Sequence, residues 1–579
     1  MPAPNIVRLT IERFRGIQAL TWLPTTGVNL ILGGGDAGKT TILDAVALLL
    51  APTNAASLSD ADYFARTLAD GFKIEAAMSL PPALAAAQTI KPAWQWEWKN
   101  NTLVVPAIGE EGPPGDLVYV LRVTGTPELE LLYEIVQPNG ECDHLSVALR
   151  RAIGIIRLSG DDRNDRDLRL VQGSALDRLL SDRGLRSRMG NKLAQTDVEA
   201  ELQAQARTAL EELDASFRSK GLPHDLDLAV TGAQGITITA LIGLTADQRG
   251  VQLPLSNWGS GTRRLSALAI AEKNQNDQSI TLVDEVERGL EPYRQRALIE
   301  KLQGGDAQSF ITTHSTSAVS AATASALWYL DHAGAIGRLD SAKVSAHQVR
   351  DPESFLSRFT IVAEGATEVG FVRVLLRRAL VAPLSNYGIL VSDGTGHETS
   401  LNLLEALSVG GLKFGGFVDN EGGRYPERWQ RIRGRLGNLL FRWQAGCLEE
   451  NFIPQVPAER LPELIAHPED GPGNRLRTLA ARLEIADKNF AAIQAAAGAR
   501  LVPLIIEAAT GTVPDGKEEE RKTYKGHATT WFKSIEGGEE IAAKMFAMGL
   551  WPHFRPALMP FLNAVRGAVG SENIDDLPP

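Results

Sequence analysis

Two periodicities of apolar and polar residues organise the first part of the chain. Residues 6–14 alternate between apolar and polar side chains, which predicts a half-buried strand. Residues 28–32 are an apolar run that ends in three glycines, which predicts a buried strand followed by a tight loop. From Lys39 to Leu50 the apolar residues recur at helical spacing, and Pro52 follows. A strand, a glycine loop and a helix are therefore expected in that order.

Further along, strand-like runs surround a helical stretch. Residues 117–123 and 131–136 predict strands between turns rich in Pro and Gly. Strand-like segments return at residues 235–242 and 279–283. Between these groups, the polar residues 160–225 carry apolar residues at helical spacing: Leu193, Val198, Leu202, Ala206, Leu210 and Leu213. We expect that stretch to be a helical insertion.

A second domain is expected from about residue 355. Short apolar runs at residues 359–363, 388–391 and 414–418 alternate with helical stretches. That alternation favours a parallel β-sheet built from β-α-β units. The polar run at residues 511–526 is predicted to be a loop.

Composition narrows the class of protein. The chain has 579 residues, of which 44% are apolar and 22% charged, as in ordinary globular proteins. Its net charge of −11 argues against general coating of nucleic acid, although a local basic groove is compatible with it. Two cysteines, Cys142 and Cys447, are too few for a disulfide framework or a thiolate zinc site. Without a signal-like start or an apolar run of roughly 18 residues, we expect a cytoplasmic protein outside membranes.

The glycine loop fits a phosphate-binding pattern. Residues 33–40 match G-x-x-x-x-G-K-[ST] between the predicted strand and the predicted helix. In such loops backbone N–H groups surround the phosphates, Lys39 neutralises the β- and γ-phosphate oxygens, and Thr40 offers its hydroxyl to Mg²⁺. The predicted ATP and Mg²⁺ site comprises Gly33, Gly35, Asp36, Gly38, Lys39, Thr40 and Thr41.

An acidic pair supplies the second half of the nucleotide site. The apolar strand at residues 279–283 would deliver Asp284 to the Mg²⁺ shell. Glu285 would act as the catalytic residue that polarises the attacking water. The long separation between Lys39 and Asp284 supports an insertion in the nucleotide-binding domain.

Five segments, taken in order, resemble the ABC-type ATPase heads of the SMC, RecF and OLD (overcoming lysogenization defect) groups. They are residues 9–16, the phosphate loop, and residues 257–264, 283–292 and 311–315. The resemblance implies that Ser260 and Gly261, in the glycine-rich signature, close on the nucleotide of a second copy. It also implies that His314 senses the γ-phosphate. The signature has glycine where the usual LSGGQ pattern has serine, and there is no long heptad stretch for an SMC-type coiled coil.

Carboxylates follow successive strands of the second domain. Glu364 follows the first strand and Glu368 opens the next helix; Asp393 follows the second strand, and Asp419 and Glu421 the third. Because parallel strands deliver their C-terminal ends to one edge of the sheet, these acids should converge there. Clustered carboxylates repel one another unless a cation lies between them, and all-oxygen ligands favour Mg²⁺ or Mn²⁺.

This order of acids resembles the Toprim domain of topoisomerases, primases and OLD nucleases. Residues 446–451 and 531–538 further resemble segments of class 2 OLD nucleases, a group that includes the ATPase-nuclease subunit of the Gabija antiphage system. The resemblance implies Glu449, with Glu450 as the rival, as a further metal ligand. It implies that Lys533 stabilises the charge that develops on the phosphate in the transition state. A UvrD-type helicase partner and a role in antiphage defence follow from the same resemblance.

Together these patterns predict an α/β chain. We expect an ABC-type ATPase head in residues 1–159 and 226–350, a helical dimerisation insertion in 160–225, and a Toprim nuclease domain with a parallel sheet and further helices in 355–579. The predicted function is ATP-gated, metal-dependent cleavage of double-stranded DNA by a homodimer or larger homo-oligomer. The alternative is a RecF- or SMC-like DNA-clamp ATPase whose Toprim domain is not catalytic. Candidate phosphate contacts, which could equally form a solvated helix face, are Arg373, Arg377, Arg378, Arg424, Arg428, Arg431, Arg433 and Arg435.

Overall fold

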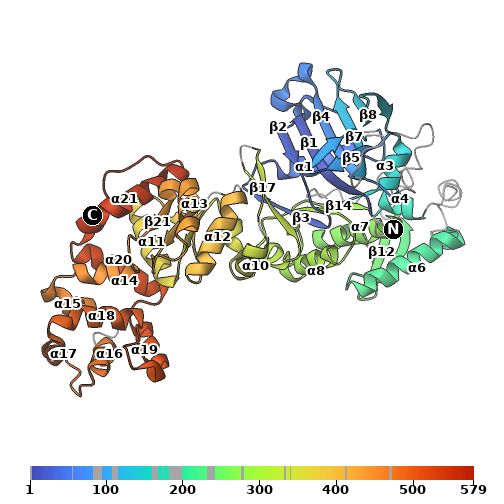
Figure 1. Ribbon diagram of the computed structural model, residues 1–579. Helices are drawn as coiled ribbons and strands as arrows, with labels where there is room; N and C mark the ends of the chain where they lie inside the picture. The colour runs from blue at the N-terminus through green and yellow to red at the C-terminus, as the bar shows by residue number, and fades with distance from the viewer. Residues whose placement is uncertain are drawn as a thin grey trace. The chain divides into compact units, whose positions relative to one another are not determined.

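The computed structural model places the chain in two compact units, Met1–Ser341 and Ala342–Pro579. It describes the chain apart from residues 1–2, 55–56, 82–93, 107–114, 159–166, 172–173, 181–198, 231–241, 276–278, 332–333, 340, 411, 413, 421, 468–472 and 579. The predicted strand at residues 235–242 and the predicted helical positions Leu193 and Val198 lie almost entirely outside the described residues. Figure 1 labels the elements of both units.

An antiparallel sheet forms the first layer of the N-terminal unit. Its central order is β2-β1-β4-β7-β5-β6, and β8 and β9 extend it from β7. The alternating burial of β1 confirms the half-buried strand predicted from its periodicity. The strands are β1 (Asn5–Phe14), β2 (Ile17–Trp22), β4 (Phe72–Ser79), β5 (Trp96–Lys99), β6 (Thr102–Val104), β7 (Asp116–Gly125), β8 (Leu131–Val136) and β9 (Cys142–His144).

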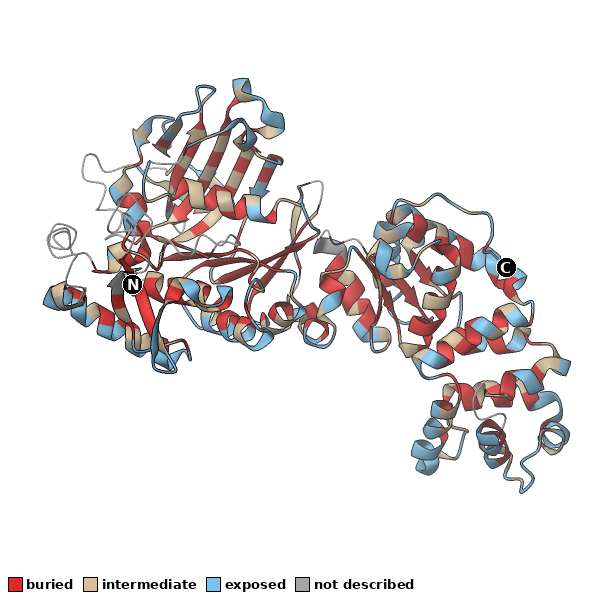
Figure 2. Ribbon diagram, turned by 180° about the vertical axis from the view of Figure 1, so that it is seen from behind, coloured by how far each residue is buried: buried red, intermediate tan, exposed pale blue. Residues whose placement is uncertain are grey.

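A second, mostly parallel sheet carries the predicted phosphate loop. Its order is β10-β14-β15-β3-β16-β17, with only β17 antiparallel to its neighbour. The strands are β3 (Val28–Gly33), β10 (Ile155–Leu158), β14 (Ile280–Val283), β15 (Ser309–Thr312), β16 (Ala326–Leu330) and β17 (Ile336–Arg338). Residues of β3, β14, β15 and β16 are buried throughout, as Figure 2 shows in red. Continuous apolar runs are typical of parallel strands covered on both faces.

Helices cover both faces of this sheet. Helix α1 shares one apolar core with the antiparallel sheet and with β3, β14 and β15, so it lies between the two sheets (Figure 1). On the other side lie α7 and α8 (Figure 1). The helices are α1 (Lys39–Leu49), α3 (Val147–Ile153), α7 (Ser260–Gln275), α8 (Pro292–Gln303) and α9 (Thr316–Ala321).

Within the range predicted as an insertion, α6 (Ala204–Ser219) is a long amphipathic helix. Its apolar residues Leu210, Leu213 and Phe217 share a core with α7 and with β12. The elements around it are α4 (Ala175–Leu180), β11 (Asp227–Val230), β12 (Ile242–Gln248) and β13 (Val251–Pro254). The inner face of α6 therefore packs onto the helix that begins with Ser260 and Gly261.

The C-terminal unit is built on a four-stranded parallel sheet of order β19-β18-β20-β21. The predicted strands at 359–363 and 414–418 are present with those bounds. The sheet and the helices along it are β18 (Phe359–Ala363), α11 (Ala366–Ala379), β19 (Ile389–Asp393), α12 (His397–Gly410), β20 (Phe414–Val418), α13 (Pro426–Leu436) and β21 (Leu440–Arg442). This arrangement delivers the ends of β18, β19 and β20 to one edge.

Further helices complete this unit around one large apolar core. They are α14 (Leu448–Phe452), α15 (Leu461–Ile465), α16 (Gly473–Leu483), α17 (Phe490–Ala497), α18 (Leu501–Thr510), α19 (Arg521–His527), α20 (Ile535–Ala547) and α21 (Trp551–Ala568). The prediction of a loop over residues 511–526 was wrong in part, because α19 begins within it. Its Tyr524 is buried against the preceding helices.

Two features differ from what the sequence pattern suggested. Helix α10 (Ser341–Arg350) belongs largely to the C-terminal unit, so the units divide before the expected boundary near residue 350. Among the described residues, Phe490–Thr510 is long and apolar enough to cross a membrane, with a mean hydropathy of 1.4. Arg500 and Glu507 interrupt its apolar run. In the structure this segment is α17 and α18, separated by a short turn that starts at Gly498.

Candidate functional site

The phosphate loop joins β3 to α1. Gly33 has a φ of +150°, and a Cβ there would lie 2.3 Å from the carbonyl oxygen of Leu330 on neighbouring β16. Gly38 precedes α1 with a φ of +97°, a conformation that favours glycine. Asp36, between them, has a φ of +58°. The glycines of the pattern are therefore required by this turn, which ends at a helix N-terminus suited to anions.

Lys39 and Thr40 form the first turn of α1. The Lys39 Nζ donates to the carbonyl oxygens of Gly33, at 3.0 Å, and Gly34, at 2.7 Å. Burial lowers the pKa of Lys39, although nearby Asp284 acts in the opposite direction. The Thr40 hydroxyl donates to Asp284 Oδ1 at 3.0 Å. The two halves of the predicted nucleotide site therefore meet in space.

Asp284 and Glu285 follow β14. Asp284 Oδ1 also accepts a hydrogen bond from Thr312 Oγ1 at 2.7 Å, and the Glu285 N–H donates to the same hydroxyl at 2.8 Å. Glu285 has a φ of +47°, which non-glycine residues rarely adopt. Arg264, on α7, is buried and donates to the main-chain oxygens of Asp284 and Glu285. Burial lowers the pKa of Arg264 to about 10. This arginine, which the sequence analysis did not identify, holds the acidic turn in place.

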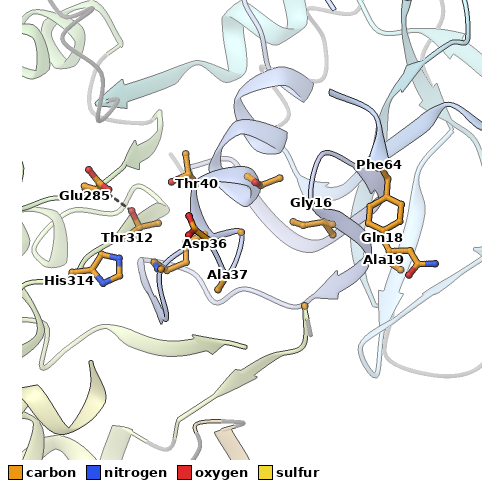
Figure 3. A pocket seen from close by; sticks show the side chains of 16 residues that line it. Gly16, Gln18, Ala19, Asp36, Ala37, Thr40, Phe64, Glu285, Thr312 and His314 are labelled. Carbon is orange, nitrogen blue, oxygen red and sulfur yellow. Dashed lines mark hydrogen bonds between the residues drawn. The ribbon is translucent and has the colours of Figure 1, made fainter. Parts of the chain in front are cut away.

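A pocket of about 690 Å³ opens beside the loop (Figure 3). Asp36 and Thr40 lie on one side, Glu285, Thr312 and His314 on another, and Gln18 and Phe64 at the far end (Figure 3). The remaining lining residues are Gly16, Ile17, Ala19, Gly35, Ala37, Gly38, Lys39, Thr41 and Gly334. The pocket therefore joins a phosphate-binding end to a more apolar one.

His314 lines this pocket at the end of β15. Its backbone N–H donates to Glu287 Oε1 at 2.8 Å, which fixes the main chain. Burial and the charge of Lys39 lower the pKa of the imidazole, so His314 is neutral at neutral pH. A neutral ring can donate a hydrogen bond to a terminal phosphate.

Ser260 and Gly261 begin α7 and do not line the pocket. A Cβ on Gly261 would lie 1.9 Å from the Gly289 carbonyl oxygen. Gly289 has a φ of +70°, and a Cβ there would lie 2.3 Å from Ser260 Oγ. The signature segment is therefore in close contact with the turn after Asp284 in the same copy. This placement is compatible with the signature serving the nucleotide of another copy.

Four buried carboxylates meet at the edge of the C-terminal sheet. Glu364 follows β18, Asp419 follows β20, Glu368 is in the first turn of α11, and Glu449 is in α14. Their exposed fractions are 6%, 5%, 4% and 0%. Glu364 Oε2 accepts a hydrogen bond from the Asp419 N–H at 3.0 Å. The structure thus brings together acids from four separate stretches of sequence.

The carboxylates raise one another's pKa. Burial and the nearby Glu368, Glu364 and Glu449 raise the pKa of Asp419 to about 10. Burial and Glu449 raise the pKa of Glu368 to about 7. Glu368 Oε1, Asp419 Oδ1 and Glu449 Oε2 are buried and accept no hydrogen bond from any described residue. Unpartnered buried oxygens of this kind are costly, and a bound cation would satisfy them.

Lys533 is the cation that the structure itself places here. Its Nζ lies 3.0 Å from Glu449 Oε1, and its side chain is 39% exposed. Burial opposes the charged form, but Glu449 and Glu368 outweigh it and raise the lysine pKa above its usual value. Lys533 therefore remains charged and reaches from solvent to the carboxylates.

Three other predicted acids are not among these four buried carboxylates. Asp393 ends β19 in a half-buried position, and its Oδ1 accepts from the Thr395 N–H at 2.7 Å. Glu450 is exposed and accepts from the Cys447 N–H at 2.9 Å, capping α14. Glu421 lies outside the described residues. Within the described part of the chain, no three or more His, Cys, Asp or Glu side chains already have the arrangement of a metal site.

Two further side chains border the carboxylates and were not predicted. His397 begins α12, with Nδ1 3.5 Å from Glu364 Oε2, and its ring packs against Trp429. Arg442 ends β21, lies 5.0 Å from the Trp429 ring, and donates to the Asp419 carbonyl oxygen at 3.4 Å. Arg442 is the last residue of the fourth parallel strand, β21. Had the sequence analysis recognised residues 440–442 as a strand, Arg442 would have been a candidate at the same sheet edge.

Comparisons with known proteins concern mainly the N-terminal unit. A profile of the family described as "AAA domain, putative AbiEii toxin, Type IV TA system" matches residues 130–320. That range includes Asp284, Glu285 and His314, and the phosphate loop precedes it. The chain contains an ATP-binding ATPase domain. The geometry of the phosphate loop and of Asp284 agrees with this match.

Similarity to named relatives is short or distant. The DNA replication and repair protein RecF of Shewanella baltica (strain OS155) is 47% identical over 45 residues, which are 8% of this chain and 12% of RecF. RecF of Shewanella sp. (strain MR-4) is 44% identical over 45 residues, again 12% of its length. The chain therefore matches about an eighth of these curated relatives. The ATPase domain is related in sequence to RecF over that stretch.

The solved structures that the chain matches include a RecF and an Smc head. The recombination mediator RecF bound to ATP has a TM-score of 0.36 at 14% identity, covering 58% of this chain and 98% of that one. The Smc head domain derived from Pyrococcus furiosus, bound to the C-terminal domain of ScpA, has a TM-score of 0.37 at 14% identity. It covers 60% of this chain and 100% of that one.

Proposed function

We propose that this ATPase is also a divalent-metal-dependent DNA endonuclease, with its hydrolytic site in the C-terminal unit. The observation that carries the proposal is the meeting of Glu364, Glu368, Asp419 and Glu449, with Lys533 beside them. A fold does not bury four carboxylates, three of them with unpartnered oxygens, unless something offsets the cost. Divalent ions with oxygen ligands offset it and supply a reaction.

Each residue has a role in this proposal. Glu364, Glu368, Asp419 and Glu449 would hold Mg²⁺ or Mn²⁺, with Asp393 and Glu421 as further candidate ligands. Two such ions supply activation of water and stabilisation of the leaving oxygen of a phosphodiester. The Lys533 ammonium would offset charge that develops on the phosphate in the transition state. The order of these acids supports a Toprim domain of the class 2 OLD type.

The ATPase unit would gate this site. ATP would occupy the pocket at Lys39 and Thr40, with Glu285 polarising water and His314 contacting the γ-phosphate. Ser260 and Gly261 of a second copy would close the pocket, which makes a homodimer the smallest active form. The naming of the RecF relatives for DNA replication and repair supports double-stranded DNA as the substrate. A UvrD-type helicase partner and antiphage defence rest on the sequence motifs alone.

A second candidate function is a RecF- or SMC-like DNA clamp whose C-terminal unit binds without cleaving. Two observations favour it. The matching curated relatives are RecF proteins. Among the described residues, no three carboxylates have the arrangement of a preformed metal site. In a clamp the buried acids would be neutralised by protons and by Lys533.

Plasmid cleavage separates the two functions. Wild-type protein with Mn²⁺ or Mg²⁺ should nick or linearise supercoiled plasmid, and the Glu364→Gln variant should not. Glutamine keeps an oxygen that can accept from the Asp419 N–H but removes the charge, so the fold is preserved. The same preparations should hydrolyse ATP alike. If wild type and Glu364→Gln cleave equally, or neither cleaves with either ion, the nuclease proposal fails and the clamp remains.

A further inference from the structure

Most basic side chains around the C-terminal site already have partners. Arg428 donates to Glu405 at 2.7 Å, and Arg431 lies 3.4 Å from the same carboxylate. Arg378 lies 4.0 Å from the centre of the Phe546 ring. These contacts indicate a solvated or structural role for three of the eight arginines expected to meet phosphate. Two others, Arg373 and Arg377, line a pocket.

Arg373 and Arg377 lie one turn apart on α11. They line a pocket of about 480 Å³ whose other walls are apolar: Pro383, Leu384, Ile389, Leu390 and Val391. Arg373 is half-buried, donates to the Val391 carbonyl oxygen at 3.4 Å, and has no ion pair with any residue that the structure describes. Arg377 forms an ion pair with Glu539 at 3.0 Å in an exposed position, where water and salt weaken the attraction between the two charges. A guanidinium has five N–H donors, so most of those on Arg373 are available to a ligand.

The pocket is close to the carboxylate cluster. Arg373 follows Glu368 by five residues on α11, a rise of about 7.5 Å at about 1.5 Å per residue. Val391, on its other wall, lies two residues before the end of β19. Successive phosphates of one DNA strand are separated by about 3.4 Å along the duplex axis. Arg377 is a further turn along, about 13.5 Å from Glu368, and the pocket extends from these arginines toward the start of β19. The pocket therefore lies about two to four nucleotides from the acids.

We propose that this pocket binds one backbone phosphate of the DNA strand that enters the carboxylate cluster. Arg373 makes the contact to the phosphate oxygens, Arg377 adds positive charge, and the apolar wall of Leu384 and Ile389 packs against the sugar. The inference rests on the proposed nuclease function and names a phosphate subsite of it. A chain of net charge −11 requires such a local basic site to attract DNA.

Salt dependence of DNA binding tests the phosphate contact. In the cleavage-deficient Glu364→Gln background, Arg373→Gln should weaken binding of a short duplex on the order of tenfold near 100 mM salt. The slope of log affinity against log salt concentration should fall by about 1. Arg373→Lys should retain the slope. Arg378→Gln removes the same charge from the next turn of α11 and is the matched control, with no change in slope.

A modified duplex locates the phosphate. An uncharged methylphosphonate, placed singly at each position within about four nucleotides of the cleaved bond, should weaken binding at one position about as much as Arg373→Gln does. Combining that duplex with Arg373→Gln should add no further loss, because both changes remove one contact. Melting temperatures equal to the parent confirm that the variants are folded.

The outcomes separate the subsite from the proposed function. If Arg373→Gln and Arg378→Gln lower affinity and slope equally, only net charge matters and the subsite is refuted. Additive losses in the combined experiment also refute it. If the wild-type protein binds DNA without cleaving it, the expected Arg373 effect still supports the phosphate subsite while the nuclease proposal fails. If the wild-type protein does not bind duplex DNA at all, both are overturned.

Discussion

Glu449 and Glu450 are neighbours in the sequence with opposite surroundings. Glu449 is fully buried beside Lys533, whereas Glu450 is exposed and caps α14. Glu449→Gln should therefore reduce Mn²⁺-dependent cleavage by on the order of 100-fold, because a metal ligand loses its charge. Glu450→Gln makes the same substitution at the neighbouring residue and should leave the cleavage rate within about twofold of wild type. Equal loss in both variants would contradict the assignment of Glu449 as the ligand.

The raised pKa values of Glu368 and Asp419 make the metal-free protein sensitive to pH. Both carboxyl groups have a higher pKa in the folded than in the unfolded protein, so proton binding stabilises the folded state. This contribution to the free energy of unfolding is complete below about pH 4, the unfolded pKa of such groups. It decreases as the pH rises through the Glu368 pKa of about 7. Mn²⁺ replaces those protons, so it should bind more tightly at pH 8 than at pH 6.

Thermal unfolding measures this linkage. At about a hundredfold excess of Mn²⁺ over its dissociation constant at pH 8, the melting temperature of the C-terminal unit should rise by about 5 °C or more. The rise should be smaller at pH 6 with the same Mn²⁺ concentration. The control is the same buffer without Mn²⁺, brought to equal ionic strength with a sodium salt. Equal increases at both pH values would mean that Mn²⁺ does not displace these protons.

At this scale the sequence located the acids better than their partners. Glu364, Asp393 and Asp419 follow apolar strands, and a strand end can be recognised from one short stretch of residues. Which oxygens meet depends on contacts across the fold, and Glu449 reaches Asp419 from α14, which a pattern of strand ends does not indicate. The proximity of His397 to Glu364 depends on the packing of α12 against α13, which no local pattern contains.

Among the elements, the segment before Lys533 is held from three sides. Arg475, on α16, is buried and forms two 2.7 Å contacts with Glu540 of α20. The same guanidinium donates to the carbonyl oxygens of Thr530, at 3.1 Å, and Trp531, at 3.0 Å. Thr367, next to Glu368, donates to the Phe532 carbonyl oxygen at 2.8 Å. This network fixes the main chain that carries Lys533.

Removing one charge from this network should be costly. Glu540→Gln leaves the Arg475 guanidinium buried without its carboxylate, which should lower the free energy of unfolding by about 3–5 kcal/mol. Glu463→Gln breaks the exposed ion pair with Arg460 and should cost at most about 1 kcal/mol. Urea unfolding of both variants measures the difference. Similar values for the two would show that the buried pair does not anchor the segment.

The elements themselves differed in how readily the sequence predicted them. Strands β18 and β20 were confirmed with their bounds, because continuous apolar runs between turn residues have few alternative structures. Helix α19 was missed because its residues are mostly polar, and Tyr524 is its one buried residue. Helix α10 groups with the C-terminal unit through contacts that local patterns do not contain, such as that of His347 with Ser392, 45 positions away.

For the whole molecule, the nucleotide pocket and the signature segment are both present in one copy but apart. ATP should therefore join two copies through Ser260 and Gly261. Glu285→Gln should slow hydrolysis by about 100-fold or more and accumulate an ATP-dependent dimer, because water is no longer polarised. Adding Ser260→Arg, which places a bulky cation at the interface, should return the protein to its ATP-free oligomeric state.

Light scattering after size exclusion, with and without ATP, gives the mass of each species. Thr323→Arg is the control: it introduces the same bulk and charge in the exposed turn before β16, at the sheet edge opposite the phosphate loop. A mass that does not respond to ATP in the Glu285→Gln variant would contradict closure between copies. So would an ATP-dependent dimer that persists with Ser260→Arg.

The central claim is that buried acids from separate stretches of the C-terminal half hold divalent ions. Anomalous diffraction from crystals soaked in Mn²⁺ tests it most directly, because the scattering identifies manganese without reference to activity. The account predicts at least one strong peak within about 2.5 Å of carboxylate oxygens of Glu364, Asp419 or Glu449. Well-ordered carboxylates with no manganese among them would contradict it.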